Sequence, residues 1–306
     1  MLLKEQNFGV EIELVKITRE KAAAIIACYF GTEAWNAARQ FGYRAWAAED
    51  RKGRTWKCVS DASLNDRNGG CEVVTPILQY EDIEDLQKIV RLLRENGAKA
   101  DSSCGIHVHV DASRHTVDSL QRLMNFAVGR QDLFYEALNI SSYRSGRFCK
   151  KMNKNLLTAM KHDNVRTKDS VERIWYSSLN DGYTGTNNRA HYNVTRYHGI
   201  NLHAFFTKGT VEFRLFNGTT HAGKIKAYIQ FCLAMSAWAI EAKETTGRLF
   251  FKSAAKLTKE QKRQLMLRVL KNRLGLKGWE FRTARLHLTA AFRTDGSNES
   301  AAYSNG

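Results

Sequence analysis

The stretch FGVEIELV at residues 8–15 alternates apolar with acidic side chains. Val10, Ile12 and Leu14 recur at every second residue, and Glu11 and Glu13 stand between them. This period of two is typical of a β-strand with one apolar face and one polar face. Because both glutamates point to the same side, the sheet that contains this strand is predicted to carry carboxylates on one face.

Three further stretches place ionisable residues in a similar way. CGIHVHVD (104–111) carries His107 and His109, TVEFRLFNG (210–218) carries Glu212 and Arg214, and CEVVTP (71–76) carries Glu72. Several carboxylates on one face repel one another unless cations neutralise them. The pattern therefore predicts a divalent metal site of carboxylates and imidazole, which suits Mg²⁺ or Mn²⁺ better than zinc. An arginine in the same patch adds a donor for phosphate oxygens.

The remaining periodicities predict helices separated by short strands. Helices are expected at 19–40 with an interruption at Gly31, and at 81–97, 116–139, 168–179, 224–242 and 259–274. A hairpin is expected over 43–50 and 54–61, and a strand at 197–206 is expected to pair with 210–218. The strands show no regular βαβ rhythm, which indicates an antiparallel sheet of the α+β class.

Composition limits the class of protein. The chain has 306 residues with 47 Lys and Arg against 31 Asp and Glu, and residues 246–306 hold 13 of the basic residues but 4 of the acidic ones. We therefore predict a main domain over 1–245 and a basic, partly helical extension over 246–306 with a disordered end, which an anionic partner would bind. Scattered cysteines, the charged N-terminus and the lack of a long apolar run favour a cytoplasmic protein without a membrane partner.

Five motifs in order resemble a known family. FGVEIEL, DASL with GGCEVVTPIL, CGIHVHVD, RYHGINL and TVEFRLFNGT look like the signature of the putative amidoligase enzymes, which are carboxylate–amine ligases similar to glutamine synthetase and glutamate–cysteine ligase. The resemblance spans residues 8–242. It implies a glutamine-synthetase-like antiparallel sheet curved into an active-site funnel and backed by helices. It also implies ATP-dependent formation of an amide or isopeptide bond through an acyl phosphate, with ATP and Mg²⁺ or Mn²⁺ as cofactors.

The resemblance further implies a role for each matching residue. The implied metal ligands are Glu11, Glu13, Glu72, His107, His109 and Glu212, with the choice between the two histidines left open. Arg214 is expected to contact phosphoryl oxygens, and Asp61 to bind the amine or the carboxylate substrate. Arg196 and Asn201 are expected at substrate or nucleotide contacts. Arg144 and Arg147 form a basic loop that either meets phosphate or is solvated.

Other functions explain less of the sequence. A nuclease with a His-hydrophobic-His strand would use His107 and His109 for metal and Tyr135 as nucleophile, but it leaves the glutamates without roles. A zinc amidohydrolase would need its His-x-His pair on an early barrel strand. A nucleic-acid-binding protein without catalysis would explain the basic extension alone. The substrates of a ligase are not specified by the sequence beyond a carboxylate and an amine, and oligomerisation stays open.

Overall fold

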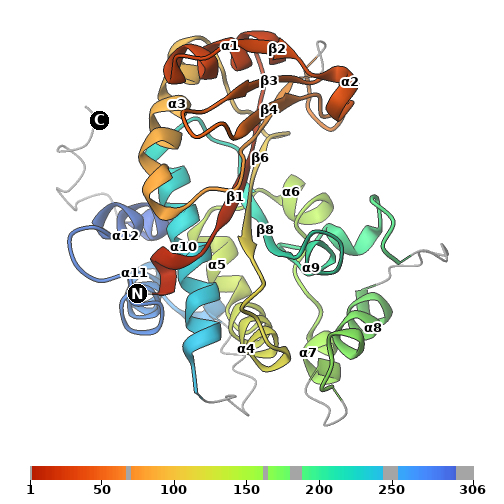
Figure 1. Cartoon of the computed structure of the whole chain (residues 1–306). Helices are drawn as coiled ribbons and strands as arrows, with labels where there is room; N and C mark the ends of the chain where they lie inside the picture. The colour runs from red at the N-terminus through yellow and green to blue at the C-terminus, as the bar shows by residue number, and fades with distance from the viewer. Residues whose placement is uncertain (1, 67–69, 161–164, 180–187, 244–253, 294–306) are drawn as a thin grey trace.

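The computed structural model describes residues 2–66, 70–160, 165–179, 188–243 and 254–293. In this part of the chain eight antiparallel strands form one sheet in the order β2-β3-β4-β5-β1-β6-β8-β7 (Figure 1). The strands are β1 (Phe8–Leu14), β2 (Ala34–Asn36), β3 (Trp46–Glu49), β4 (Thr55–Val59), β5 (Cys71–Val74), β6 (Gly105–Asp111), β7 (Ile200–Asn201) and β8 (Thr210–Asn217). The predicted antiparallel sheet is thus confirmed, with β1 in its interior between β5 and β6.

Helices cover the apolar face of the sheet. The helices of the described residues are α1 (Arg19–Phe30), α2 (Ala38–Phe41), α3 (Ile83–Glu95), α4 (Val117–Val128), α5 (Gln131–Ala137), α6 (Ser142–Arg147), α7 (Lys154–Met160), α8 (Lys168–Leu179), α9 (His203–Lys208), α10 (Ala222–Glu241), α11 (Lys259–Arg268) and α12 (Arg282–Leu288). α3 and α10 lie on one side of the strands, and α6 and α9 lie on the other (Figure 1). α10 packs against α3, α4 and β6, and most of its residues are buried, including all of those from 227 to 237.

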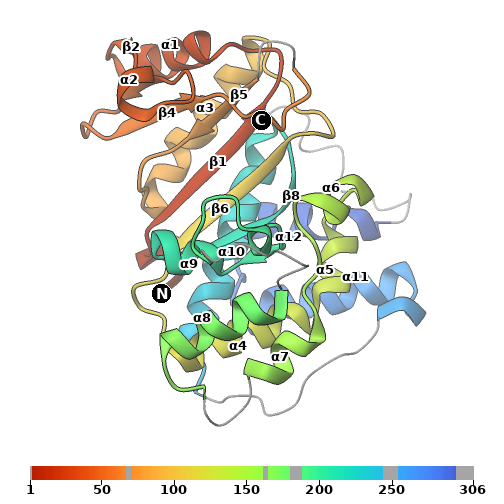
Figure 2. The same ribbon diagram turned by 90° about the vertical axis from the view of Figure 1, so that its right-hand side faces the viewer.

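The alternation in β1 determines which face is covered. Val10, Ile12 and Leu14 are buried in the main apolar core together with Val73 of β5 and Val108 of β6. Ile12 lies opposite Val73 on one side and opposite Ile106 on the other. Because opposite residues of antiparallel strands point to the same face, the apolar rows of the three strands coincide. The glutamates of β1 consequently point to the other face, where α9 lies in front of the strands (Figure 2).

Three predicted elements differ from the structure. The helix expected at 19–40 ends at Gly31, which takes a left-handed φ of 74°, and β2 and α2 follow it. The helix expected at 116–139 is divided into α4 and α5 at Gly129. The strand expected at 197–206 was wrong for most of its length, because β7 is followed at once by α9. There the Asn201 side-chain oxygen accepts a hydrogen bond from the backbone N–H of His203 at 2.8 Å and starts the helix.

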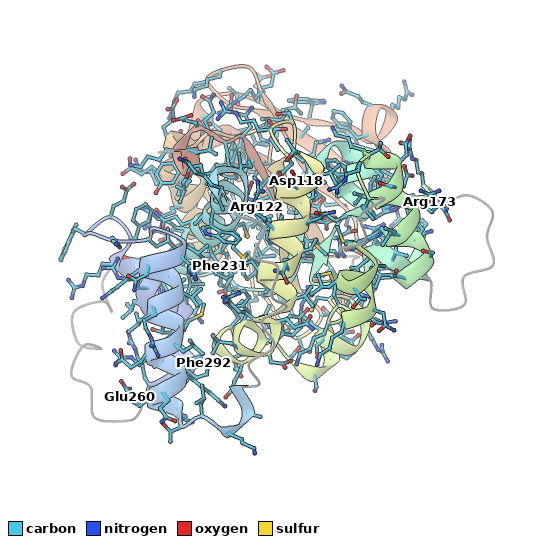
Figure 3. All side chains as sticks on the ribbon, turned by 90° about the horizontal axis from the view of Figure 1, so that it is seen from below. Asp118, Arg122, Arg173, Phe231, Glu260 and Phe292 are labelled. Carbon is cyan, nitrogen blue, oxygen red and sulfur yellow. The ribbon has the colours of Figure 1, made fainter. Side chains whose placement is uncertain are left out.

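The basic C-terminal segment packs onto the sheet domain where it is described. α12 contacts α10, and Leu270, Leu288 and Phe292 belong to the same apolar core as α10. Figure 3 labels Phe231 of α10 and Phe292 toward the interior of the molecule, and Glu260 of α11 at its edge. The predicted domain boundary at 245 stays a prediction, and the end expected to be disordered (294–306) lies outside the described residues. Among the helices that the structure describes, none has the length and apolarity to cross a membrane.

Candidate active site

A row of polar side chains crosses the open face of the sheet. Strand register places Glu13 opposite Glu72, Glu11 opposite His107, and His109 opposite Glu212. On β7, Asn201 continues the row opposite Glu212. Since opposite residues share a face, residues from five neighbouring strands (β5, β1, β6, β8 and β7) converge there. The structure thus brings together the six residues that were predicted from the sequence as metal ligands. Their role in binding metal remains a prediction.

Glu11 lies between the two histidines. Its Oε2 is 2.9 Å from Nδ1 of His107, and its Oε1 is 3.2 Å from Nε2 of His109. The Lys208 ammonium lies 3.6 Å from the same Oε1. Burial by itself favours the neutral carboxyl group, but His109, His107 and Lys208 together hold the pKa of Glu11 well below its usual value. Glu11 is therefore a carboxylate at neutral pH.

Glu212 forms a buried ion pair with Arg214. The Arg214 guanidinium donates to Oε1 of Glu212, and the Asn201 side-chain amide donates to Oε2 at 2.7 Å. Burial opposes ionisation, yet Arg214 and His109 lower the pKa of Glu212 to about 2. A guanidinium has five N–H donors, so Arg214 keeps donors for another acceptor. It also lines the cavity above the sheet.

Glu13 and Glu72 form the acidic end of the row. Glu13 accepts a hydrogen bond from the backbone N–H of Gly105 at 2.5 Å and lies 3.9 Å from the Arg144 guanidinium. A Cβ atom on Gly105 would collide with that guanidinium, so the glycine of CGIHVHVD makes room for Arg144. Burial, and then the charges of Glu11, Glu13 and Asp61, raise the pKa of Glu72 well above its usual value. Glu72 is thus harder to ionise than a solvent-exposed glutamate.

A cavity of about 420 Å³ opens above the row. Its walls carry acids and cations together, which are Glu11, Glu13, Asp61 and Glu72 with Arg144, Arg196, Lys208 and Arg214. Two smaller recesses adjoin it. One of about 220 Å³ includes Arg196, Asn201 and Glu212, and one of about 380 Å³ includes Glu11 and His109. The predicted site residues therefore border one of these three connected spaces, apart from Arg147.

Arg147 and Tyr135 lie elsewhere. Arg147 is exposed and its guanidinium lies 4.8 Å above the Tyr143 ring, so it is not among the residues that line the cavity. Tyr135 is buried, and its hydroxyl donates a hydrogen bond to the carbonyl of Cys149 at 2.6 Å. Burial also raises the pKa of this hydroxyl. A tyrosine held in this way is poorly placed to attack DNA, which removes the nucleophile that the nuclease alternative requires.

Several cavity residues were missed by the sequence analysis. Lys208, Ser103 and four aromatic residues line the main cavity, the aromatic ones being Tyr43, Phe148, Tyr192 and Tyr197. They belong to loops and helix ends that are far apart in the sequence, so no local spacing relates them. The sequence position of Lys208 could have indicated it as a site residue, because it precedes Gly209 and lies two residues before the motif TVEFRLFNGT of β8.

The donor set fits a divalent cation. Three ligand atoms, one each from Glu11, His107 and Glu212, lie within 4.8 Å of one another. Among the residues that the structure describes, none forms a hydrogen bond with the buried Nε2 of His107, which faces Oε1 of Glu13 at 3.5 Å. An unsatisfied buried nitrogen beside crowded carboxylates is destabilising, and a bound cation would relieve both conditions. Carboxylate oxygens with one or two imidazole nitrogens suit Mg²⁺ or Mn²⁺.

Comparison with known proteins identifies the family. The family described as "Putative amidoligase enzyme" matches residues 4–236, which include every strand of the sheet. The chain belongs to the amidoligase family. This membership supports an enzyme of the ligase type. The matched region ends within α10, before the basic C-terminal segment.

Other comparisons add little about this amidoligase. No curated protein matches the chain. Among solved structures, the chain is similar to the crystal structure of a bifunctional glutathione synthetase from Pasteurella multocida, with a TM-score of 0.42 and 14% identity. The alignment covers 97% of this chain and 51% of that one, so the chain spans about half the length of that protein. A likeness of this degree carries no argument about function.

Proposed function

We propose that the protein is an ATP-dependent carboxylate–amine ligase with a glutamine-synthetase-like active site. The observation that carries the proposal is the row of carboxylates and imidazoles over the sheet, with buried arginines beside it at the floor of one cavity. Phosphoryl transfer requires positioning and neutralisation of charge more than it requires covalent catalysis. Carboxylates for a cation and guanidinium groups for phosphate oxygens provide both.

In this proposal each group of residues has its own task. Glu11, His107 and Glu212 hold a divalent cation, and Glu13, Glu72 and His109 extend the ligand set. When bound, Mg²⁺ neutralises phosphate charge and polarises the transferring phosphoryl group. Arg214 and Arg144 bind phosphoryl oxygens, and Asn201 and Arg196 orient nucleotide or substrate. Arg147 is left out because it is exposed beyond the cavity wall.

The reaction then has two steps. A carboxylate oxygen of the first substrate attacks the γ-phosphorus of ATP, which gives an acyl phosphate and ADP. The amine nitrogen of the second substrate attacks the acyl carbon, inorganic phosphate leaves, and the nitrogen loses a proton to yield the amide. Asp61 on the cavity wall carries a carboxylate suited to bind the incoming amine. Arginines beside the floor favour the anionic carboxylate and phosphoryl groups there.

The test is a coupled product measurement. The protein is incubated with ATP, Mg²⁺ and a panel of amino acids and acidic peptides, and ADP, phosphate and new amide mass are quantified together. We expect equal amounts of ADP, phosphate and amide, and no product with EDTA. Glu13→Gln should abolish all three products, whereas Glu95→Gln, at the exposed end of α3, should not. Amide formation without ADP release, or full activity of Glu13→Gln, would contradict the proposal.

A further inference from the structure

Two solvent-exposed tyrosines stand at the mouth of the main cavity. Tyr43 is 57% exposed and Tyr192 is 65% exposed, and both line the cavity. Tyr43 lies between α2 and β3, and Tyr192 lies just before the 3₁₀ turn Val194–Arg196, so they approach the mouth from distant parts of the chain. The neighbouring Tyr43 hydroxyl raises the pKa of Tyr192. Each tyrosine therefore leaves more than half of its surface exposed beside the entrance.

The backbone holds Tyr43 in a disfavoured conformation. Gly42, Tyr43 and Arg44 have φ of 66°, 49° and 48°, the left-handed region that residues other than glycine rarely adopt. Ser60 fixes the turn, because its backbone N–H and its hydroxyl both donate to the Tyr43 carbonyl, at 2.9 and 2.7 Å. Ser60 also lines the cavity. Strain that the surroundings maintain in this way is characteristic of ligand-binding positions.

Below the tyrosines the cavity becomes cationic. The Arg196 guanidinium lies 5.9 Å from the Tyr192 ring centre and 5.6 Å from that of Tyr197. The Tyr197 ring in turn lies 5.9 Å from the Arg214 guanidinium, beside the polar row of the sheet. The cavity thus offers aromatic rings at its mouth, an arginine between rings along one wall, and guanidinium and carboxylate groups at its floor.

We propose that Tyr43 and Tyr192 form an aromatic clamp that stacks the base of the nucleotide at the cavity mouth, with its phosphates directed toward Arg196 and Arg214. The inference rests on the proposed use of ATP and adds the base-binding subsite. A nucleoside triphosphate has the required form, which is a planar ring joined to a chain of anionic groups. Stacking on an aromatic ring tolerates different bases, since each has a π-face. The clamp therefore binds adenine and guanine nucleotides with similar affinity.

The experiment separates the base from the phosphates. Binding of AMP-PNP and of inorganic tripolyphosphate, each with Mg²⁺, is measured by titration calorimetry for the full chain. Tyr43→Gly removes the ring and suits the left-handed backbone, so folding is preserved, and Tyr192→Ala removes the second ring. Tyr43→Phe and Tyr192→Phe keep the rings. Trp279→Ala is a control, because Trp279 is 78% exposed but does not line the cavity.

We expect the ring-deleting variants to bind AMP-PNP about 5- to 100-fold more weakly, with unchanged affinity for tripolyphosphate. The Phe variants and the Trp279 control should bind AMP-PNP as the unmodified protein does. Equal weakening of both ligands, or no weakening of either, would overturn the clamp while leaving ATP use intact. If the unmodified protein binds neither ligand, the proposed ATP dependence itself fails, and the clamp fails with it.

Discussion

Replacement of Glu72 by glutamine should stabilise the protein when no divalent cation is present. Glu72 lies directly opposite Glu13 on the neighbouring strand, and Glu11 and Asp61 add to the negative field around it. Burial and these charges raise its pKa well above the usual value. Glutamine has nearly the same shape and carries no charge, so the substitution removes repulsion without leaving a void.

The size of the effect follows from the strand pairing. Like charges directly opposite on antiparallel strands are destabilising by up to about 1 kcal/mol. For a chain of this length, such a gain raises the melting temperature by roughly 2 °C. A carboxyl group with a raised pKa in the folded state supports folding in acid and ceases to do so as the pH rises through that pKa. The advantage of Glu72→Gln should therefore be present at neutral pH and disappear below the ordinary carboxyl pKa of 4.5.

The assay is thermal unfolding in EDTA and in Mg²⁺. A cation at ten times its dissociation constant stabilises the folded protein by about 1.4 kcal/mol. The unmodified protein should gain this amount, while Glu72→Gln should gain less because one carboxylate is lost from the site. Glu95→Gln, exposed at the end of α3, controls for the loss of any glutamate charge. A lower melting temperature of Glu72→Gln in EDTA, or an equal Mg²⁺ gain in both proteins, would refute the reasoning.

Three further substitutions or deletions test other parts of the structure. Glu212→Gln should lower the free energy of unfolding by about 3–5 kcal/mol in denaturant titrations, because the buried Arg214 loses the carboxylate that it pairs with. A decrease of less than about 1 kcal/mol would contradict a stabilising role of this buried ion pair. Gly105→Ala should displace Arg144 and raise the KM for ATP at least about tenfold with the circular dichroism spectrum retained, since three atoms of the guanidinium occupy the space of the new Cβ. Deletion of 246–306 should yield insoluble protein because it uncovers α10, and a soluble, active product would show that the extension is separable.

The central strands and the acids on them could be predicted from the sequence. Glu11 and Glu13 alternate with apolar residues, and alternation on a strand is a local property of the backbone, so their shared face required no tertiary information. The predicted membership of the amidoligase family is confirmed over residues 4–236. The roles of the predicted ligands remain proposals that the experiments above address.

Contacts between distant segments could not be predicted in the same way. The segment 197–206 resembles a strand in composition, but only Ile200 and Asn201 form one. The backbone N–H of His203 donates a hydrogen bond to the Asn201 side chain, and α9 begins at His203. Lys208 and Tyr43 are far from each other and from Glu11 in the sequence, so no sequence pattern links the three residues. Their place at the cavity depends on how α9 and the loop before β3 fold back toward the sheet.

The sequence by itself determined that this protein has strands with one apolar and one acidic face, and that the acids, histidines and Arg214 recur at a spacing of two. Only the tertiary structure decided which strands are neighbours, and thereby that Glu11 meets both histidines and that Glu72 opposes Glu13. The physical reason is that side-chain direction along a strand is set by its own backbone, whereas pairing and register are set by hydrogen bonds and apolar packing between distant segments.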